Sequence, residues 1–264
     1  METREAMMER AREKVRKGLA RKDLLLIQAM RSLDEIEVVK GTLYERLQEW
    51  FKMNFPEMEL QNEENYCRIV AEFGSKEKVE NERLVAIIGE KNAKTFTEKM
   101  QKSLGSPFDA EDANAVSALA KKILQIMEGK KEIEAYVSKE AGKELKNLAY
   151  LTDPILAARL VETVGGLERL ARMPASTIQV VGAEKALFKH LRKGTNPPKH
   201  GIIFQSGYIR GAPMKQRGKI ARDLATKLAI AAKADFYTKN FIADKLKEKF
   251  EKRLKEIQNN RKSD

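Results

Sequence analysis

The sequence predicts an all-α fold: an antiparallel coiled-coil hairpin plus a compact helical domain with at most a small β ribbon. Apolar residues recur at steps of three and four along nearly all of the 264 residues, as they do in amphipathic helices. Charged residues make up 34% of the chain, which suits helices solvated along one face. Strand-like patterns occur only at 202–205 and 208–210. These two patches are expected to pair as the ribbon across Ser206 and Gly207.

The first segment, residues 1–61, is expected to form the helical base of the coiled coil. Its apolar positions follow helical spacing from about Glu9 to Phe51. Asn54–Pro56 contains residues that end helices. A second helix is then expected to start near Asn62 and to break around Gly74.

Residues 62–151 are expected to form the coiled-coil hairpin. A long charged helix over 76–104 is followed by a Gly-Ser-Pro turn and by a return helix over 109–148, with Asp109 as its N-cap. Thin apolar stripes on two such helices are typical of coiled coils that need a partner. The apolar positions expected to pair two copies are Leu84, Ile88, Phe96, Met100, Val116, Leu119, Ile123, Ile126 and Ile133.

Residues 152–258 are expected to form a compact domain of shorter helices. Asp153 and Pro154 are an N-cap and a first helical residue, and Gly165-Gly166 ends that helix. Further helices are predicted at 167–172, 174–180, 182–192, about 215–232 and 238–258. The polar end of the chain, 259–264, is expected to be a disordered tail.

Positive charge is concentrated between Lys185 and Arg222. This window of 38 residues holds ten Lys and Arg but no acid, whereas the whole chain has 39 acids and a net charge of +12. A concentrated field of one sign attracts a polyanion such as a nucleic acid. Phe188, His200 and Phe204 lie among the charges, and such rings stack on unpaired bases. The window therefore predicts a nucleic-acid interface.

The composition disfavours most enzyme classes. Two His and the single Cys67 are too few for a disulfide framework or a cysteine-rich zinc site. The stretch 211–220 lacks the glycine spacing and the Ser/Thr of a phosphate-binding loop. We expect no catalytic residue, no metal, no cofactor, and a reducing, intracellular location. No apolar run approaches the ~18 residues that cross a bilayer, so no membrane partner is expected.

Parts of the window admit a structural and a functional interpretation. Residues 182–192 are either an amphipathic helix with Leu187 and Leu191 buried, or a helix whose start and lysines face phosphates. His200 is either a solvated loop residue or a base-stacking group. Lys215 and its neighbouring cations begin a helix, where positive charge opposes the helix dipole. An external anion explains that placement better than local stability does.

These segments resemble the Nop domain. The matching motifs are GAEKALF at 182–188, the Pro-Lys-His-Gly loop at 198–201, GIIFQSGYI at 201–209, and residues 213–235. Upstream, residues 21–35 and 46–58 resemble the region that precedes the coiled coil in the same family. The resemblance spans roughly residues 10–258. It is strongest to the archaeal scaffold proteins of C/D-box guide ribonucleoproteins, relatives of the eukaryotic nucleolar Nop proteins.

The resemblance implies a non-catalytic scaffold in a complex that methylates ribose 2′-hydroxyls. The Nop domain is expected to bind C/D-box guide RNA at a kink-turn already occupied by a ribosomal-protein-like, kink-turn-binding protein. The coiled coil is expected to self-associate. Fibrillarin, the methyltransferase, is expected to bind an N-terminal domain that looks absent from this chain. The implied location is cytoplasmic, or nucleolar in a eukaryote.

The expected RNA contacts combine the motifs with the charge window. Gly182–Lys185 matches the GAEK motif, and Ala186–Lys189 matches the ALFR motif with Lys189 in place of Arg. Lysine keeps the charge but loses the planar fork of arginine. His200 matches the loop histidine expected to contact RNA. The full set is Gly182, Ala183, Glu184, Lys185, Phe188, Lys189, Arg192, Lys193, Lys199, His200, Gln205, Arg210, Lys215, Gln216, Arg217, Lys219 and Arg222.

Two other functions are compatible with the sequence. A non-specific, DNA-binding architectural protein would bind duplex DNA as tightly as kink-turn RNA and would need no protein co-binder. A coiled-coil adaptor would use the basic window for solubility or for an acidic partner, and would show no salt-dependent nucleic-acid binding. An enzyme would need a catalytic constellation that the sequence lacks.

Overall fold

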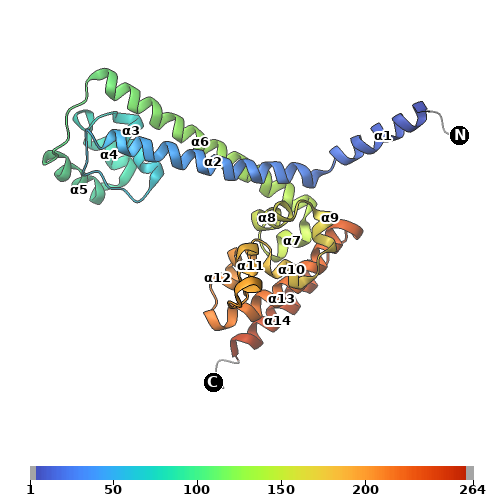
Figure 1. Cartoon of the computed structure of the whole chain (residues 1–264). Coiled ribbons are helices and arrows are strands. Elements are labelled where there is room, and N and C mark those ends of the chain that lie inside the picture. Colours follow the sequence, from blue (N-terminus) through green and yellow to red (C-terminus); the bar gives the residue numbers. More distant parts are fainter. Residues whose placement is uncertain (1–3, 260–264) are drawn as a thin grey trace. The chain divides into compact units, whose positions relative to one another are not determined.

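Residues 4–259 are described by the computed structural model, and within them every regular element is a helix (Figure 1). The all-α prediction is therefore confirmed. The chain divides into two compact units, which are described separately: unit 1 comprises residues 1–32 and 134–264, and unit 2 comprises residues 33–133. None of the described helices is both long enough and apolar enough to cross a membrane.

Unit 2 gathers short helices around parts of two long ones. The helices that contribute to it are α2 (Lys22–Phe51), α3 (Glu63–Phe73), α4 (Asn81–Ile88), α5 (Glu90–Gln101) and α6 (Ala110–Glu144), with the 3-10 turn η1 (Lys76–Lys78). Phe51 and Tyr66 lie edge to face in its core with centroids 6.2 Å apart, and Phe55 and Phe96 do so at 5.0 Å. Burying each such ring stabilises the fold by about 1.5–3 kcal/mol.

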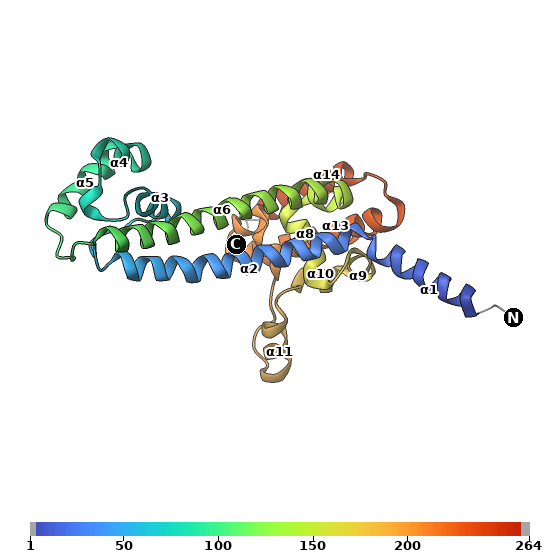
Figure 2. The same cartoon turned by 90° about the horizontal axis from the view of Figure 1, so that it is seen from above.

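The predicted helix over 76–104 is wrong. Gly89 has φ 79° and ψ 158°, a conformation that ends α4 at Ile88 and lets α5 begin at Glu90. The long neighbour of α6 within unit 2 is instead α2, which runs beside it in Figure 2. Lys130 of α6 and Glu37 of α2 form an ion pair at 2.8 Å. The hairpin therefore pairs different helices from those expected.

Seven of the nine apolar positions assigned to self-association lie in the chain's own core or pack against it. Leu84, Ile88, Phe96, Val116 and Ile123 are buried there, and Met100 and Leu119 pack against them. Ile126 and Ile133 are half-buried. The predicted stripe marks an intramolecular core because the short helices of unit 2 cover it.

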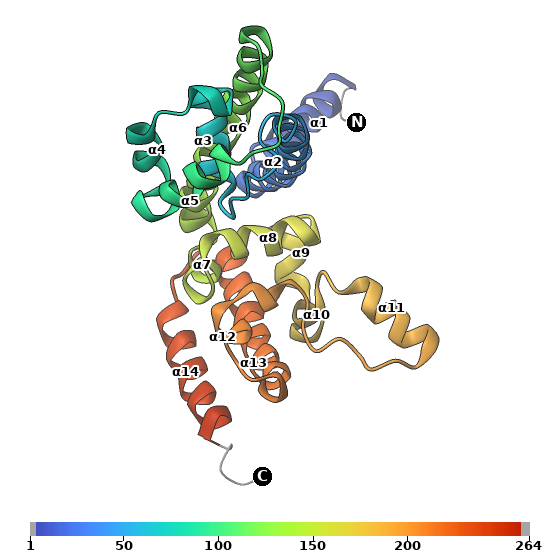
Figure 3. The ribbon, with the colours of Figure 1, turned by 90° about the vertical axis from the view of Figure 1, so that its left-hand side faces the viewer.

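Unit 1 holds α1 (Arg4–Leu19) and a bundle of shorter helices. The bundle consists of α7 (Lys146–Leu151), α8 (Pro154–Val164), α9 (Leu167–Arg172), α10 (Ala175–Val180), α11 (Glu184–Lys193), η2 (Ile202–Gln205), α12 (Gly207–Arg210), α13 (Met214–Lys233), the π-helical turn η3 (Ala234–Thr238) and α14 (Ala243–Asn259). The helix α13 lies against α10 and α14 (Figure 3). Its residues Ile220, Leu224 and Leu228 are wholly buried, so α13 is the central helix of the bundle.

Several predicted helix ends are confirmed by hydrogen bonds. The side chains of Asn62, Asp109 and Asp153 accept from backbone N–H groups three residues further on, at 3.0, 2.8 and 2.8 Å. Pro154 is the first residue of α8, and Gly165 ends that helix in the left-handed conformation. Asn259 is the last residue of α14, and the rest of the predicted tail, 260–264, lies outside the described residues.

The predicted β ribbon is wrong. Residues 202–205 form the 3-10 turn η2, and 208–210 belong to the helical turn α12. Ser206 joins them, with its N–H donating to Ile203 O and its carbonyl accepting from Ile209 N, each at 3.0 Å. Both isoleucines are wholly buried, so burial of these side chains overrides their preference for strands.

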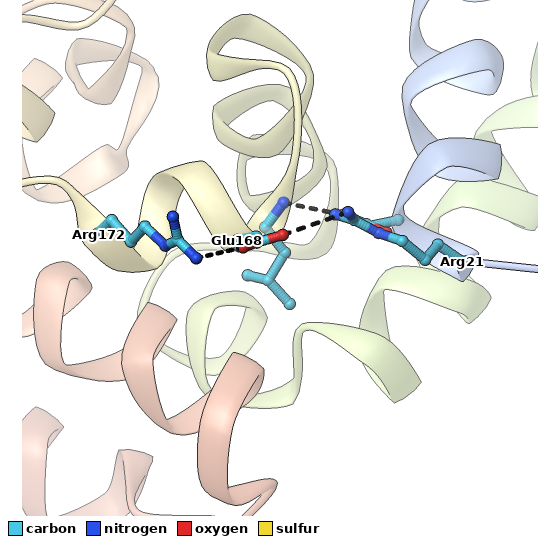
Figure 4. A network of polar contacts seen from close by, with 5 residues as sticks. Arg21, Glu168 and Arg172 are labelled. Atoms are coloured by element: carbon cyan, nitrogen blue, oxygen red, sulfur yellow. Dashed lines mark hydrogen bonds and ion pairs between the residues drawn. The ribbon is translucent and has the colours of Figure 1, made fainter. Parts of the chain in front are cut away.

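Polar contacts tie the start of α2 to α9 within unit 1 (Figure 4). Asp23 Oδ2 accepts from Arg21 Nη2 at 2.7 Å and from the backbone N–H of Leu167 at 3.0 Å. Glu168 joins Arg21 at 3.4 Å and Arg172 at 2.5 Å. Asp23 therefore satisfies an N–H group at the start of α9.

A second carboxylate, Asp235 of η3, is wholly buried. It accepts hydrogen bonds from the backbone N–H groups of Asn147 and Leu148, both at 3.0 Å, and from Asn147 Nδ2 at 2.7 Å. Burial raises the pKa of Asp235, while these three hydrogen bonds oppose the rise. The carboxylate thus caps the start of α7 from inside the core.

Replacing Asp235 with Ala is expected to lower the free energy of unfolding by about 2–4 kcal/mol, because three buried donors lose their acceptor. Asp235→Asn keeps one acceptor oxygen and should lose less. Urea titrations followed by circular dichroism give both values. Equal stability of Asp235→Ala and the unaltered protein would refute the capping role.

Glu37 generates a pH-dependent prediction for unit 2. Hydrogen bonds from Lys130 and Lys40 lower its pKa from 4.5 to about 2. Its side chain is 50% exposed, so Glu37→Gln is expected to cost only about 1 kcal/mol at pH 7. This difference should vanish as the pH falls from 4.5 toward 2, because the native carboxylate then becomes protonated.

Urea titrations at several pH values measure the effect. Glu45→Gln is the control, since Glu45 is exposed on the same helix and makes no ion pair among residues 4–259. A cost for Glu37→Gln that stays constant down to pH 2 would contradict the assignment.

Candidate nucleic-acid interface

The acid-free window leaves its cations without ion-pair partners among residues 4–259. Within residues 4–259, none of its ten Lys and Arg side chains forms an ion pair. Nine of these residues are exposed, and only Arg217 is half-buried. Acids flank the window at Glu184 and Asp223, and Asp223 is already paired with Lys227 at 3.1 Å. The sequence prediction of an unneutralised positive surface therefore holds in three dimensions.

Two backbone hydrogen bonds close residues 182–200 into a projecting arm. Gly201 N donates to Gln179 O and Ile202 N donates to Val181 O, both at 2.8 Å. A Cβ atom on Gly201 would lie 1.8 Å from Val181 O, so only glycine allows this approach. Figures 2 and 3 show α11 standing away from the other helices of unit 1.

Two residues of the GAEK motif build the start of the arm. Gly182 N donates to Glu184 Oε1 at 2.7 Å. A Cβ atom on Gly182 would lie 2.3 Å from Ile202 Cγ2, and its φ of 80° also favours glycine. Gly182 and Glu184 thus shape the turn, Ala183 beside them is half-buried, and Lys185 is exposed.

Helix α11 has no buried residue. Phe188 is 59% exposed and Leu191 is 68% exposed, whereas Leu187 is half-buried. The structural interpretation that buried both Leu187 and Leu191 is therefore wrong. Its basic residues Lys185, Lys189, Arg192 and Lys193 are exposed as expected. The arm displays apolar and cationic groups together, although exposing large apolar side chains does not stabilise the chain.

Four cations surround an open cavity of about 630 Å³ between α10, the end of the arm and α13. Lys199 comes from the loop, and Lys215, Lys219 and Arg222 come from the first half of α13. Gln179 Nε2 donates to Lys199 O at 2.7 Å and holds the loop against α10. The positive end of the α13 dipole adds to the field. This arrangement suits phosphate groups.

His200 stacks on Phe204, with ring centroids 4.6 Å apart and planes 16° from parallel. The guanidinium carbon of Arg217 lies 5.3 Å from the centroid of the same Phe204 ring. Burial, the positive charge of Arg217 and that of Lys199 lower the pKa of His200. Burial and the two cations therefore favour the neutral imidazole, the form that the cations do not repel.

The other expected contacts differ in availability. Gln205 and Arg210 are exposed. Gln216 Nε2 donates to Ile257 O at 3.1 Å, and Arg217 Nε donates to Ala212 O at 2.9 Å, so both side chains already hold backbone carbonyls. Gln179 was not among the predicted site residues, and Phe204 was named only as a ring that could stack on bases, not as a partner of His200. A ring four residues after His200 was the signal available for Phe204, but only the fold shows that it stacks.

Comparisons with known proteins agree with the predicted resemblance. The sequence profile of the Nop family, described as "snoRNA binding domain, fibrillarin", matches residues 32–256. An uncharacterized NOP5 family protein of Methanocaldococcus jannaschii is 42% identical over 248 residues, which cover 93% of this chain and 60% of that protein. Human nucleolar protein 56 is 31% identical over 254 residues, covering 92% of this chain and 43% of the relative.

The fold comparison gives the same answer. A crystal structure of a fibrillarin/Nop5p complex matches with a TM-score of 0.53 and 26% identity, covering 96% of this chain and 77% of the matched chain. The chain spans about 60% of the archaeal relative and less than half of the human one. On the extent of the profile match and the identity to these relatives, the chain belongs to the Nop family of snoRNA-binding proteins.

Proposed function

We propose that this chain is a non-catalytic scaffold of a C/D-box guide ribonucleoprotein. Unit 1 binds a kink-turn RNA together with the small ribosomal-protein-like protein that occupies the kink-turn. The observation that carries the proposal is the set of cations in 185–222 that make no ion pair among residues 4–259. Such cations favour a polyanion, and membership of a snoRNA-binding family favours RNA as that polyanion.

The interface has two chemically different parts, which supports recognition of RNA and protein together. The cavity lined by Lys199, Lys215, Lys219 and Arg222 holds phosphates of the RNA stem. The arm adds Phe188 and Leu191, whose exposed apolar surface suits a protein partner or unpaired bases. A surface of this kind binds the assembled RNA–protein complex more tightly than RNA alone.

Fibrillarin and a second copy of the chain are further proposed partners. Fibrillarin is supported by a related structure that contains it. Self-association needs a surface other than the predicted stripe, because five of those nine residues are buried in the chain's own core. Val38 on α2 is an apolar residue that such a surface could include, because its side chain is 69% exposed and lies outside the core. The proposed site of action is the cytoplasm of an archaeon or the nucleolus of a eukaryote.

A binding titration tests the scaffold function. The chain is titrated against a fluorescent C/D-type kink-turn RNA, with and without the kink-turn-binding protein, and against duplex DNA of equal length. We expect tight binding only to the preformed RNA–protein complex. Equal affinity for all three would favour the architectural DNA-binding alternative, and no salt-dependent binding would favour the adaptor.

A charge substitution in the cavity tests the phosphate contacts. Lys219→Gln is expected to weaken the ternary complex and to lower the slope of log K against log salt by about one unit per lost contact. Lys245→Gln is the matched control, because Lys245 is exposed on α14 outside the acid-free window. If the two variants have the same slope, Lys219 does not contact a phosphate.

A further inference from the structure

We propose that Phe204 is a positioning residue: it holds the His200 ring by face-to-face stacking, so that the ring offers its opposite face to an unpaired RNA base, and Arg217 supports Phe204. This inference rests on the proposed function, because it assigns the parts of that same site. It gives Arg217 a role different from the phosphate contact that its charge suggests.

The geometry of the two rings carries the argument. A centroid separation of 4.6 Å and an interplanar angle of 16° define an offset stack. His200 lies in the loop before η2 and Phe204 lies within η2, so the stack orients a loop side chain on a helical turn. Ile203, beside Phe204, is wholly buried and anchors that turn. A ring held in this way loses less rotational freedom when a base stacks on it.

The guanidinium of Arg217 is already held by contacts around η2 and α12. Its Nε donates to Ala212 O at 2.9 Å and one Nη donates to Arg210 O at 3.4 Å. Its guanidinium lies over Phe204 at 5.3 Å, within the range of a cation–π contact. The cations around the cavity have no such bonds among residues 4–259. Arg217 therefore stabilises the stack, while Lys215, Lys219 and Arg222 are available for phosphates.

A neutral imidazole suits this role. The charged groups that face His200 are Arg217 of α13 and Lys199 of its own loop, and the side chain packed on it, Phe204 of η2, is uncharged. Burial and these two cations disfavour the protonated ring. Neutral His200 presents an uncharged aromatic face, which accepts any unpaired base by stacking.

A double-mutant cycle on the ternary complex tests the inference. His200→Ala is expected to weaken binding about 10-fold and Phe204→Leu about 5-fold, by loss of one stacked base. The double variant should bind no more weakly than His200→Ala alone, because Phe204 acts through His200. Phe204→Tyr keeps the ring and should keep the affinity. Multiplying effects in the double variant would overturn the proposal.

Two further variants complete the cycle. Tyr208→Leu is the control: it removes a nearby half-buried ring that packs on Phe250 and not on His200. Any fold-loss of affinity that it causes should therefore multiply with the fold-loss caused by His200→Ala. Arg217→Lys keeps the charge but loses the planar group, and its loss of affinity should disappear in the His200→Ala background. If Arg217→Lys weakens binding equally with and without His200, Arg217 contacts a phosphate and does not act through the stack.

An RNA-free measurement separates this inference from the proposed function. The chain has only two His, so an NMR titration with His190→Gln as assignment control reports His200 alone. Phe204→Leu is expected to move the pKa of His200 up toward 6.5, because the ring that buries it is lost. An unchanged pKa would refute the positioning role even if RNA binding is confirmed. Failure of the unaltered chain to bind the RNA–protein complex would instead refute the proposed function.

Discussion

The candidate interface of unit 1 depends on two backbone hydrogen bonds that join the start of η2 to the end of α10. Gly201 N and Ile202 N bond to the carbonyls of Gln179 and Val181, and these contacts bring both ends of the arm to one point. The approach requires glycine at 201 because any side chain would collide with Val181 O. Once the ends are held, α11 needs no packing of its own, and the following loop lies beside α13.

In unit 1, different residues supply the stability of the fold and the proposed binding surface. The buried residues of unit 1 come mainly from the start of α2, from α6 to α10, and from η2, η3 and α12 to α14, while α11 contributes none. Unpaired cations at the start of α13 oppose its dipole and repel one another. They persist because the buried face of the same helix supplies the stability. An anionic partner neutralises this preformed positive surface, which nothing in the isolated chain does, and binding is favourable for that reason.

Unit 2, in contrast, uses its large apolar residues mainly for its own core, in which most of them are buried. There α3, α4 and α5 cover residues of α2 and α6 that would otherwise be exposed. The ion pair between Glu37 of α2 and Lys130 of α6 then joins the two long helices. A second copy of the chain would therefore meet a surface mainly of charged and scattered apolar residues.

The sequence alone determined the helical class, the helix start near Asn62, the caps at Asp109 and Asp153, and the charge window, because each depends on neighbours in the chain. Motif similarity predicts most of the proposed interface between Gly182 and Arg222. Tertiary structure alone decided that α2 pairs with α6, that 202–210 is helical, that Leu191 is exposed, and that Phe204 meets His200. Those outcomes depend on which distant residues compete for burial, and a periodic pattern cannot specify its own partner.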